Sequence, residues 1–137
     1  MDEPLNLVLF SGTDDKLQAA AVLTAGAAAL GKPVNIFLQY WALDAFRSNR
    51  IRADHGLAPE AGSAGRAAVD ALAEAGQATW ADTLRQAKDL GGVDIQACSL
   101  SMDLLHLDST DLDPLVDGVE GVTAFYLNAG DGQVVFI

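Results

Sequence analysis

The apolar positions of the chain alternate between short unbroken runs and longer segments with helical spacing. Runs at 5–10, 33–39 and 93–97 have the length and composition of buried strands. Between the first two, residues 16–30 are Ala-rich and end at Gly31, which is typical of a helix end. One face of this predicted helix is small or apolar throughout: Leu17, Ala20, Ala21, Thr24 and Ala28. This spacing of strand, helix and strand over about 30 residues is that of a βαβ unit.

The middle of the chain predicts helices separated by a long connection. Residues 40–46 are expected to begin a helix, whereas 51–77 are rich in Ala and Gly. Within that stretch we predict a short helix near 66–74, and the stretch is either a mobile lid or a long surface connection. Thr79 and Asp82 have capping-box spacing at the start of a further helix, which ends at the paired glycines before the 93–97 strand.

The C-terminal third contains shorter segments. Residues 101–105 are expected to be helical, and 109–118 predict a second short helix with Pro114 in its first turn. Residues 133–137 predict a final strand. The pattern at 122–130 fits a strand or a helix, and a strand there would form a hairpin with the last one.

The alternation of strands and helices predicts the α/β class, as a three-layer α/β/α sandwich with a mostly parallel sheet of about five strands. We expect residues 1–137 to form a single domain. In such folds ligands bind at the carboxyl ends of the strands. Three segments are therefore expected near one edge of the sheet: Ser11–Asp15, Tyr40–Trp41 and Cys98–Ser101.

Charge and cysteine content narrow the function classes. Eight Lys and Arg against 19 Asp and Glu give a net charge of −11, which repels nucleic acid and anionic membrane surfaces. No apolar run approaches the roughly 20 residues that span a bilayer. The start of the chain lacks the basic region of a signal peptide, and one cysteine cannot form an intrachain disulfide. We therefore expect a cytoplasmic protein with no nucleic-acid or membrane partner.

Cys98 is the candidate for chemistry because it stands where a strand is expected to turn into a helix. Unpaired N–H groups and the positive end of a helix dipole favour the thiolate, which is the nucleophilic form. Ser99 and Ser101 could donate hydroxyl hydrogen bonds to the sulfur. Asp103 would oppose the thiolate if it pointed inward. The alternative is that Cys98 is a small buried hydrophobe.

Metal and phosphate chemistry have weaker support in the sequence. His55 and His106 are the only histidines, and neither has metal-ligand spacing with Cys98, so we expect no metal and no cofactor. A Cys–His dyad with His106 remains open. The segment "SGTDDK" lacks the glycine pattern of a phosphate loop, and its two aspartates would repel phosphate.

Two blocks of the sequence carry a family resemblance. The first is "LVLFSGTDDKLQAAAVLTAGAAALGKPVNIFLQYWAL" (7–43), and the more specific second is "DIQACSLSMDLLHLDSTDLDPLVDGVEGVTAF" (94–125). In the second, a strand leads into Ala-Cys-x-x-Ser-Met-Asp, then a short acidic segment and Asp-Gly-Val-Glu. The chain resembles the DsrE/DsrF-like proteins, in particular the single-domain branch often labelled peroxiredoxin-like.

This resemblance implies compact α/β/α subunits that assemble as homo-oligomers, either trimers or hexamers. It also implies that Cys98 accepts a sulfane sulfur as a persulfide and passes it on. The implied donors and acceptors are rhodanese-like or TusA-like proteins. For the ambiguous segment, the resemblance favours a helix at 122–129 preceded by a short strand near Val119.

The candidate thiol and the family resemblance lead to three possible functions. The first is a sulfur carrier or sulfurtransferase. The second is a non-catalytic oligomeric binding module of a sulfur-relay complex. The third is a thiol-dependent peroxide reductase, which would need a second thiol from another molecule. The residues expected at the site are Cys98 as the catalytic thiol and Ser99, Ser101, Met102, Thr13 and Trp41 around the substrate.

Overall fold

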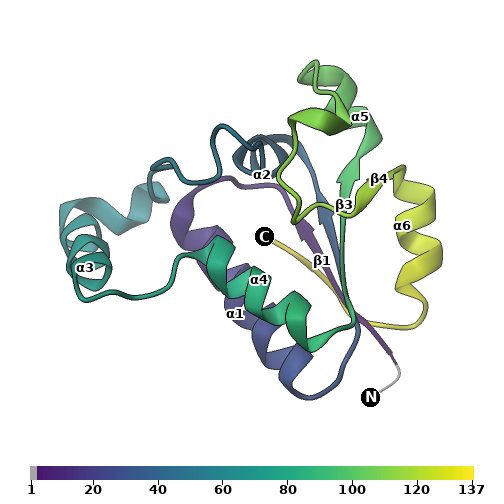
Figure 1. The fold of residues 1–137 in the computed structure, drawn as a ribbon, viewed down its shortest axis with the longest axis horizontal. Coiled ribbons are helices and arrows are strands. Elements are labelled where there is room, and N and C mark those ends of the chain that lie inside the picture. The colour runs from purple at the N-terminus through teal and green to yellow at the C-terminus, as the bar shows by residue number, and fades with distance from the viewer. Residues whose placement is uncertain (1–2) are drawn as a thin grey trace.

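A computed structural model of the chain describes residues 3–137. Its centre is a five-stranded sheet in the order β4-β3-β2-β1-β5, in which every pair of neighbours is parallel (Figure 1). The strands are β1 (Leu5–Leu9), β2 (Val34–Leu38), β3 (Val93–Cys98), β4 (Gly118–Glu120) and β5 (Val134–Phe136). Helices cover both faces, so the predicted three-layer α/β/α class is confirmed.

The parallel arrangement requires a crossover between successive strands, and helices supply it. Residues 122–129 form helix α6 (Val122–Ala129), and β5 returns to pair with β1, so that Val135 lies opposite Leu7. The hairpin alternative is therefore wrong, and the helix at 122–129 is confirmed. The short strand expected near Val119 is β4.

Helices α1 (Asp14–Ala29) and α4 (Trp80–Leu90) lie side by side on one face of the sheet, and α6 lies on the other (Figure 1). The predicted faces of both helices are buried, and the small side chains of α1 allow α4 to pack closely against it. The main core between these helices and the sheet includes Leu7, Leu9, Leu17, Ile36, Leu38, Leu84 and Ile95.

Three further helices lie outside these layers. Helices α2 (Tyr40–Ala45) and α5 (Ser99–Leu104) follow the ends of β2 and β3. Helix α3 (Gly62–Glu74) stands away from the sheet after a 3₁₀ turn at Pro59–Ala61, and none of its residues is buried (Figure 1). Within the described part of the chain, no helix is long and apolar enough to cross a membrane.

The helix predicted at 109–118 is wrong. Only a 3₁₀ turn, Ser109–Asp111, and a turn at Pro114–Leu115 are present before Gly118 opens β4. The Asp113 N–H donates to the Phe46 carbonyl at 2.9 Å, and the Ser48 N–H donates to the Asp111 carbonyl at 2.9 Å. Hydrogen bonds to a distant segment have therefore replaced those of a local helix.

The helices α4 and α1 begin with different capping arrangements. Thr79 caps α4 by accepting the Asp82 N–H at 3.2 Å. Thr13 occupies the cap position of α1 but makes no side-chain capping bond. The two aspartates after it bond instead to the connection that precedes α3.

Gly12 lies where two loops pack closely at the edge of the sheet, and its replacement tests that packing. A Cβ at Gly12 would collide with the backbone carbonyl of Trp41, whereas a Cβ at Gly26, in the exposed interior of α1, would meet open space. We expect Gly12→Ala to lower the free energy of unfolding by about 1–3 kcal/mol because the backbone must shift. The control Gly26→Ala is expected to raise it by about 0.5–1 kcal/mol through helix propensity. Urea denaturation measures both, and equal effects of the two variants would contradict the packing.

Candidate functional site at the carboxyl edge of the sheet

The loops after β1, β2 and β3 meet at one edge of the sheet, as the parallel topology predicts. The Ala42 N–H donates to the Phe10 carbonyl at 3.0 Å, which joins α2 to the end of β1. The Tyr40 N–H donates to Ser101 Oγ at 3.1 Å, which joins α2 to the start of α5. These two hydrogen bonds hold the ends of β1, β2 and β3 together as one surface.

Cys98 is the last residue of β3 and the residue from which α5 begins. Its side chain packs with Phe37 and Phe125, whose rings stack at 5.0 Å, in a small apolar cluster on the α6 face of the sheet. The thiol is free, and only 5% of the residue is exposed. The thiol is therefore buried beneath its neighbours at the end of β3.

Glu120 is the residue of β4 that lies opposite Cys98 in register. Neighbouring strands are about 4.8 Å apart and paired residues point to the same face, so Glu120 and Cys98 are neighbouring positions on the α6 face of the sheet. Burial, and then the charge of Asp94, raise the pKa of Glu120, while the Asn128 amide donates to it at 3.3 Å and opposes that rise. Asp103, the carboxylate that the sequence suggested as a neighbour of the thiol, is exposed on α5.

The sequence could not identify Glu120 because the pairing of β3 with β4 is set by strand order. Glu120 is 22 positions beyond Cys98, and nothing in the spacing indicates contact. The one available signal is the "DGVEG" segment (117–121), which places a carboxylate in a very short strand.

The serines on α5 have different environments. Ser101 is fully buried, and its hydroxyl accepts the Tyr40 N–H, so it fastens two loops together. Ser99 is exposed, and its hydroxyl lies near Gly121. No hydrogen bond from either serine to the Cys98 sulfur is present in the part of the chain that the structure describes.

The remaining predicted residues lie around this edge without touching the thiol. Met102 is buried in the main core. The Thr13 hydroxyl is 3.4 Å from that of Ser11 at the start of α1. Trp41 is 56% exposed on α2, and its ring packs against that of Tyr40 at 6.0 Å.

Tyr40 is held in a strained backbone conformation, with a φ of 43°. Positive φ is unusual for a bulky residue, and such strain costs on the order of 1–3 kcal/mol and concentrates at functional sites. The bond to Ser101 and ring packing on Phe10, at 5.0 Å, hold Tyr40 in place. The strain lies at the end of β2, next to the segment that carries the thiol.

The two histidines lie apart from this arrangement. His106 is exposed beyond α5, and His55 packs against Trp80, with ring centres 6.1 Å apart. Neither makes a hydrogen bond to Cys98 in the described structure, so the Cys–His dyad gains no support. Within residues 3–137, no group of three His, Cys, Asp or Glu side chains is placed to hold a metal ion.

The chain is thus a parallel α/β/α protein with its single thiol at the end of a central strand. Residues 1–63 match the profile of the DsrE/DsrF/DrsH-like family. YrkE of Bacillus subtilis (strain 168) is 30% identical over 149 residues, covering 93% of this chain and 92% of YrkE. The chain belongs to the DsrE/DsrF/DrsH-like family, which is tied to sulfur relay.

Solved structures share this fold. The ychN protein from E. coli superposes with a TM-score of 0.59 at 13% identity, covering 100% of both chains. MTH1491 from Methanobacterium thermoautotrophicum superposes with a TM-score of 0.54 at 14% identity, covering 99% of this chain and 100% of MTH1491. At these identities the likeness shows the fold alone.

The bond from Tyr40 to Ser101 gives a test of the edge. We expect Ser101→Ala to lower the free energy of unfolding by about 1–3 kcal/mol, because a strained, partly buried N–H loses its acceptor. The matched control is Ser99→Ala, which removes an exposed hydroxyl and is expected to change stability by less than about 0.5 kcal/mol. Denaturant unfolding measures both. A neutral Ser101→Ala would show that this hydroxyl does not hold the edge together.

Proposed function

We propose that the protein is a sulfur carrier that accepts a sulfane sulfur on Cys98 and relays it to a partner protein. The observation that carries this proposal is the position of the only thiol of the chain at the carboxyl edge of a parallel sheet. Membership of a family tied to sulfur relay supports it. The proposed compartment is the cytoplasm.

The proposed step is an exchange at sulfur that needs no external oxidant or reductant. The Cys98 thiolate attacks the outer sulfur of a donor persulfide. A new S–S bond forms at Sγ, the S–S bond of the donor breaks, and the donor thiolate leaves. An acceptor thiolate then attacks the outer sulfur of the Cys98 persulfide and regenerates the Cys98 thiolate.

Hydrogen-bond donors near Cys98 are proposed to stabilise the persulfide anion. The first N–H groups of a helix lack partners within that helix, so those of Ser99 to Met102 at the start of α5 are the proposed donors. The exposed Ser99 hydroxyl is a further donor. Thr13 and Trp41, from the loops after β1 and β2, are proposed to line the approach to the sulfur.

Exposed apolar side chains near this edge fit the docking of a protein donor or acceptor. They are Trp41, Leu100, Leu104, Val119 and Val122. A partner that covered them would bury apolar surface and bring its own thiol toward Cys98. The proposed partners are rhodanese-like donors and TusA-like acceptors.

A second exposed apolar group lies on α6 and β5 and supports self-association. It consists of Tyr126, Leu127, Val134 and Phe136. These residues contribute to no described core, and a soluble chain commonly buries such a surface against a copy of itself. We propose a homo-oligomer, trimeric or hexameric.

The second candidate function is a non-catalytic binding module of a relay complex. The burial of Cys98 favours it, because a covered thiol is hard for a donor to reach. A peroxide reductase is a weaker candidate because the chain contains no resolving thiol.

Sulfur loading separates these functions. The purified protein is incubated with a polysulfide, or with thiosulfate and a rhodanese, and intact masses are taken before and after a reductant. We expect a gain of one sulfur that the reductant reverses and that Cys98→Ser abolishes. An unmodified thiol with every donor would contradict the carrier and favour the module. Sulfenic acid formation with fast peroxide turnover would favour the reductase.

Glu120 gives a second test of the same thiol. We expect Glu120→Gln to speed alkylation of Cys98 at neutral pH by roughly 3- to 10-fold, because removal of a neighbouring negative charge favours the reactive anion. Asp103→Asn is the matched control, since it removes an exposed carboxylate from α5, and it is expected to have little effect. Iodoacetamide kinetics measure both variants. A larger effect of Asp103→Asn would show that the wrong carboxylate has been assigned to the sulfur.

A further inference from the structure

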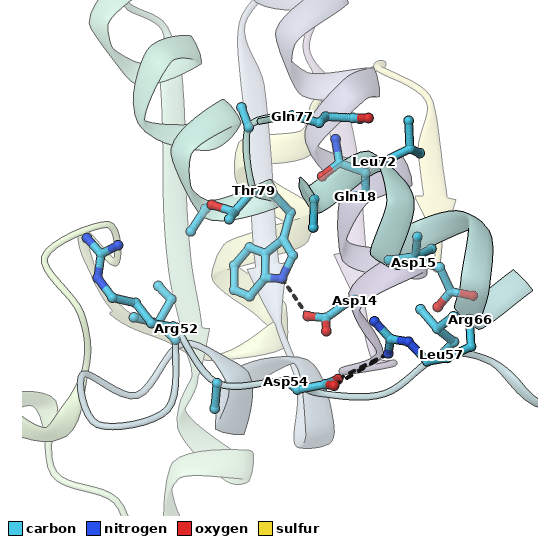
Figure 2. A pocket seen from close by; sticks show the side chains of 17 residues that line it. Asp14, Asp15, Gln18, Arg52, Asp54, Leu57, Arg66, Leu72, Gln77 and Thr79 are labelled. Carbon is cyan, nitrogen blue, oxygen red and sulfur yellow. Dashed lines mark hydrogen bonds and ion pairs between the residues drawn. The ribbon is translucent and has the colours of Figure 1, made fainter. Parts of the chain in front are cut away.

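A cavity of about 550 Å³ lies beneath α3, on the side of the molecule that carries α1 and α4 (Figure 2). The start of α1, residues 51–57, α3 and the start of α4 enclose it. Cys98 belongs to the opposite face of the sheet, with α6, so this site does not depend on the proposed sulfur chemistry. A volume of this order accommodates a small organic molecule.

The walls of the cavity are largely apolar. Ile51, Leu57 and Trp80 contribute from the body of the protein, and Val69 and Leu72 contribute from α3. Leu72 is 51% exposed, and no residue of α3 is buried. The helix thus presents its apolar residues to a space that no side chain fills, and a molecule in that space would cover both walls.

One end of the cavity is negatively charged. Asp14 Oδ1 accepts the Trp80 indole N–H at 2.9 Å (Figure 2), and Asp14 Oδ2 accepts the His55 backbone N–H at 3.0 Å. Each carboxylate oxygen has two lone pairs, so Asp14 retains accepting capacity toward the cavity. Asp15 accepts the Ala58 N–H at 3.1 Å. Among residues 3–137, neither aspartate forms an ion pair with a lysine or arginine side chain.

Within residues 3–137, the arginines at the cavity form no direct ion pair with Asp14 or Asp15. Arg66 pairs with Asp70 at 2.7 Å and with Asp54 at 3.4 Å, and it attracts Asp14 only at longer range. The guanidinium of Arg52 is turned away from Asp14 (Figure 2). The dipole of α1 contributes about half a positive charge at its N-terminus, which offsets part of the charge of two carboxylates.

Two further carboxyls at the cavity, Asp15 and Asp54, have lowered pKa values. Burial alone would raise the pKa of Asp15, but hydrogen bonds from the Thr13 hydroxyl and the Ala58 N–H outweigh it, and the net shift is downward. The Gly56 N–H, and then Arg66, lower the pKa of Asp54. Both carboxyls are therefore ionised well below neutral pH.

We propose that this cavity binds a small organic cation, whose apolar body lies between Trp80 and Leu72 and whose ammonium group pairs with Asp14. The recognition is that of an amphipathic amine: apolar walls hold the body, and a carboxylate with free lone pairs takes the charge. Asp15, beside Asp14 on the first turn of α1, adds to the negative potential that attracts the cation.

Tryptophan fluorescence tests the proposal on the full chain. Trp41→Phe replaces the exposed indole of α2 and leaves Trp80, which lines the cavity, as the only tryptophan. The probes are phenylbutylamine, phenylbutanol and phenylbutyrate, which share an apolar body and differ in charge. We expect saturable binding of the amine, about 3- to 5-fold tighter than the alcohol, with the carboxylate weakest. The preference for the amine is expected to shrink as salt is added.

Variants locate the site and its charge. Leu72→Gln is expected to weaken the amine and the alcohol alike, whereas its matched control Leu90→Gln, at a 63% exposed position at the end of α4, is expected to change neither. Asp14→Asn is expected to abolish the preference for the amine. If Asp14→Asn does not fold, Asp15→Asn is the variant that removes a negative charge from the cavity.

Three results would overturn the proposal. The first is the absence of saturable amine binding. The second is a carboxylate that binds as tightly as the amine. The third is an equal response of the Leu72 and Leu90 variants.

Discussion

The constraint on which this structure depends is that all five strands run in the same direction. A parallel sheet cannot be closed by tight hairpins, so the chain must cross over after each strand, and it does so through helices on both faces. The carboxyl ends of β1, β2 and β3 consequently meet at one edge. The hydrogen bond from Tyr40 to Ser101 and the close approach of Gly12 to Trp41 are local results of that convergence.

The alternation of side chains along β3 separates the two candidate sites. Ala97 faces the main core beneath α1 and α4, and Cys98, one residue later, faces the smaller cluster under α6. The thiol therefore lies beside Glu120 and the exposed apolar residues of its own face. The cavity under α3 belongs to the other face. One sheet thus carries the thiol on one face and the proposed ligand cavity on the other.

Much of this fold could be predicted from the sequence because it is encoded in local periodicity. The buried faces of α1 and α4, the three central strands and the position of Cys98 at a strand end follow from apolar spacing and glycine stops. The non-helical segment around Asp113 could not be predicted, since its partners are the carbonyl and N–H groups of residues 46–48. A local pattern that suits a helix gives way when distant backbone groups offer the same bonds.

The candidate site was predictable only in part, for the same physical reason. The thiol and the neighbouring serines are contiguous in the sequence, but the role of Ser101 depends on where α2 begins, and the role of Glu120 depends on strand order. The cavity escaped prediction because α3 is Ala-rich and has no buried face, so its pattern resembles that of a surface connection.

The central claim is that the Cys98 sulfur reacts from the folded protein, at the edge that the parallel sheet creates. The most direct measurement is the rate of Cys98 modification by a thiol reagent as urea is raised from zero toward the unfolding transition. The account predicts a slow but measurable rate that stays flat well below the transition, because the nearly covered thiol is reached by small movements of its neighbours. A rate that rises exponentially from the lowest urea concentrations, in step with global unfolding, would show that the sulfur is sealed in the native state and would contradict the account.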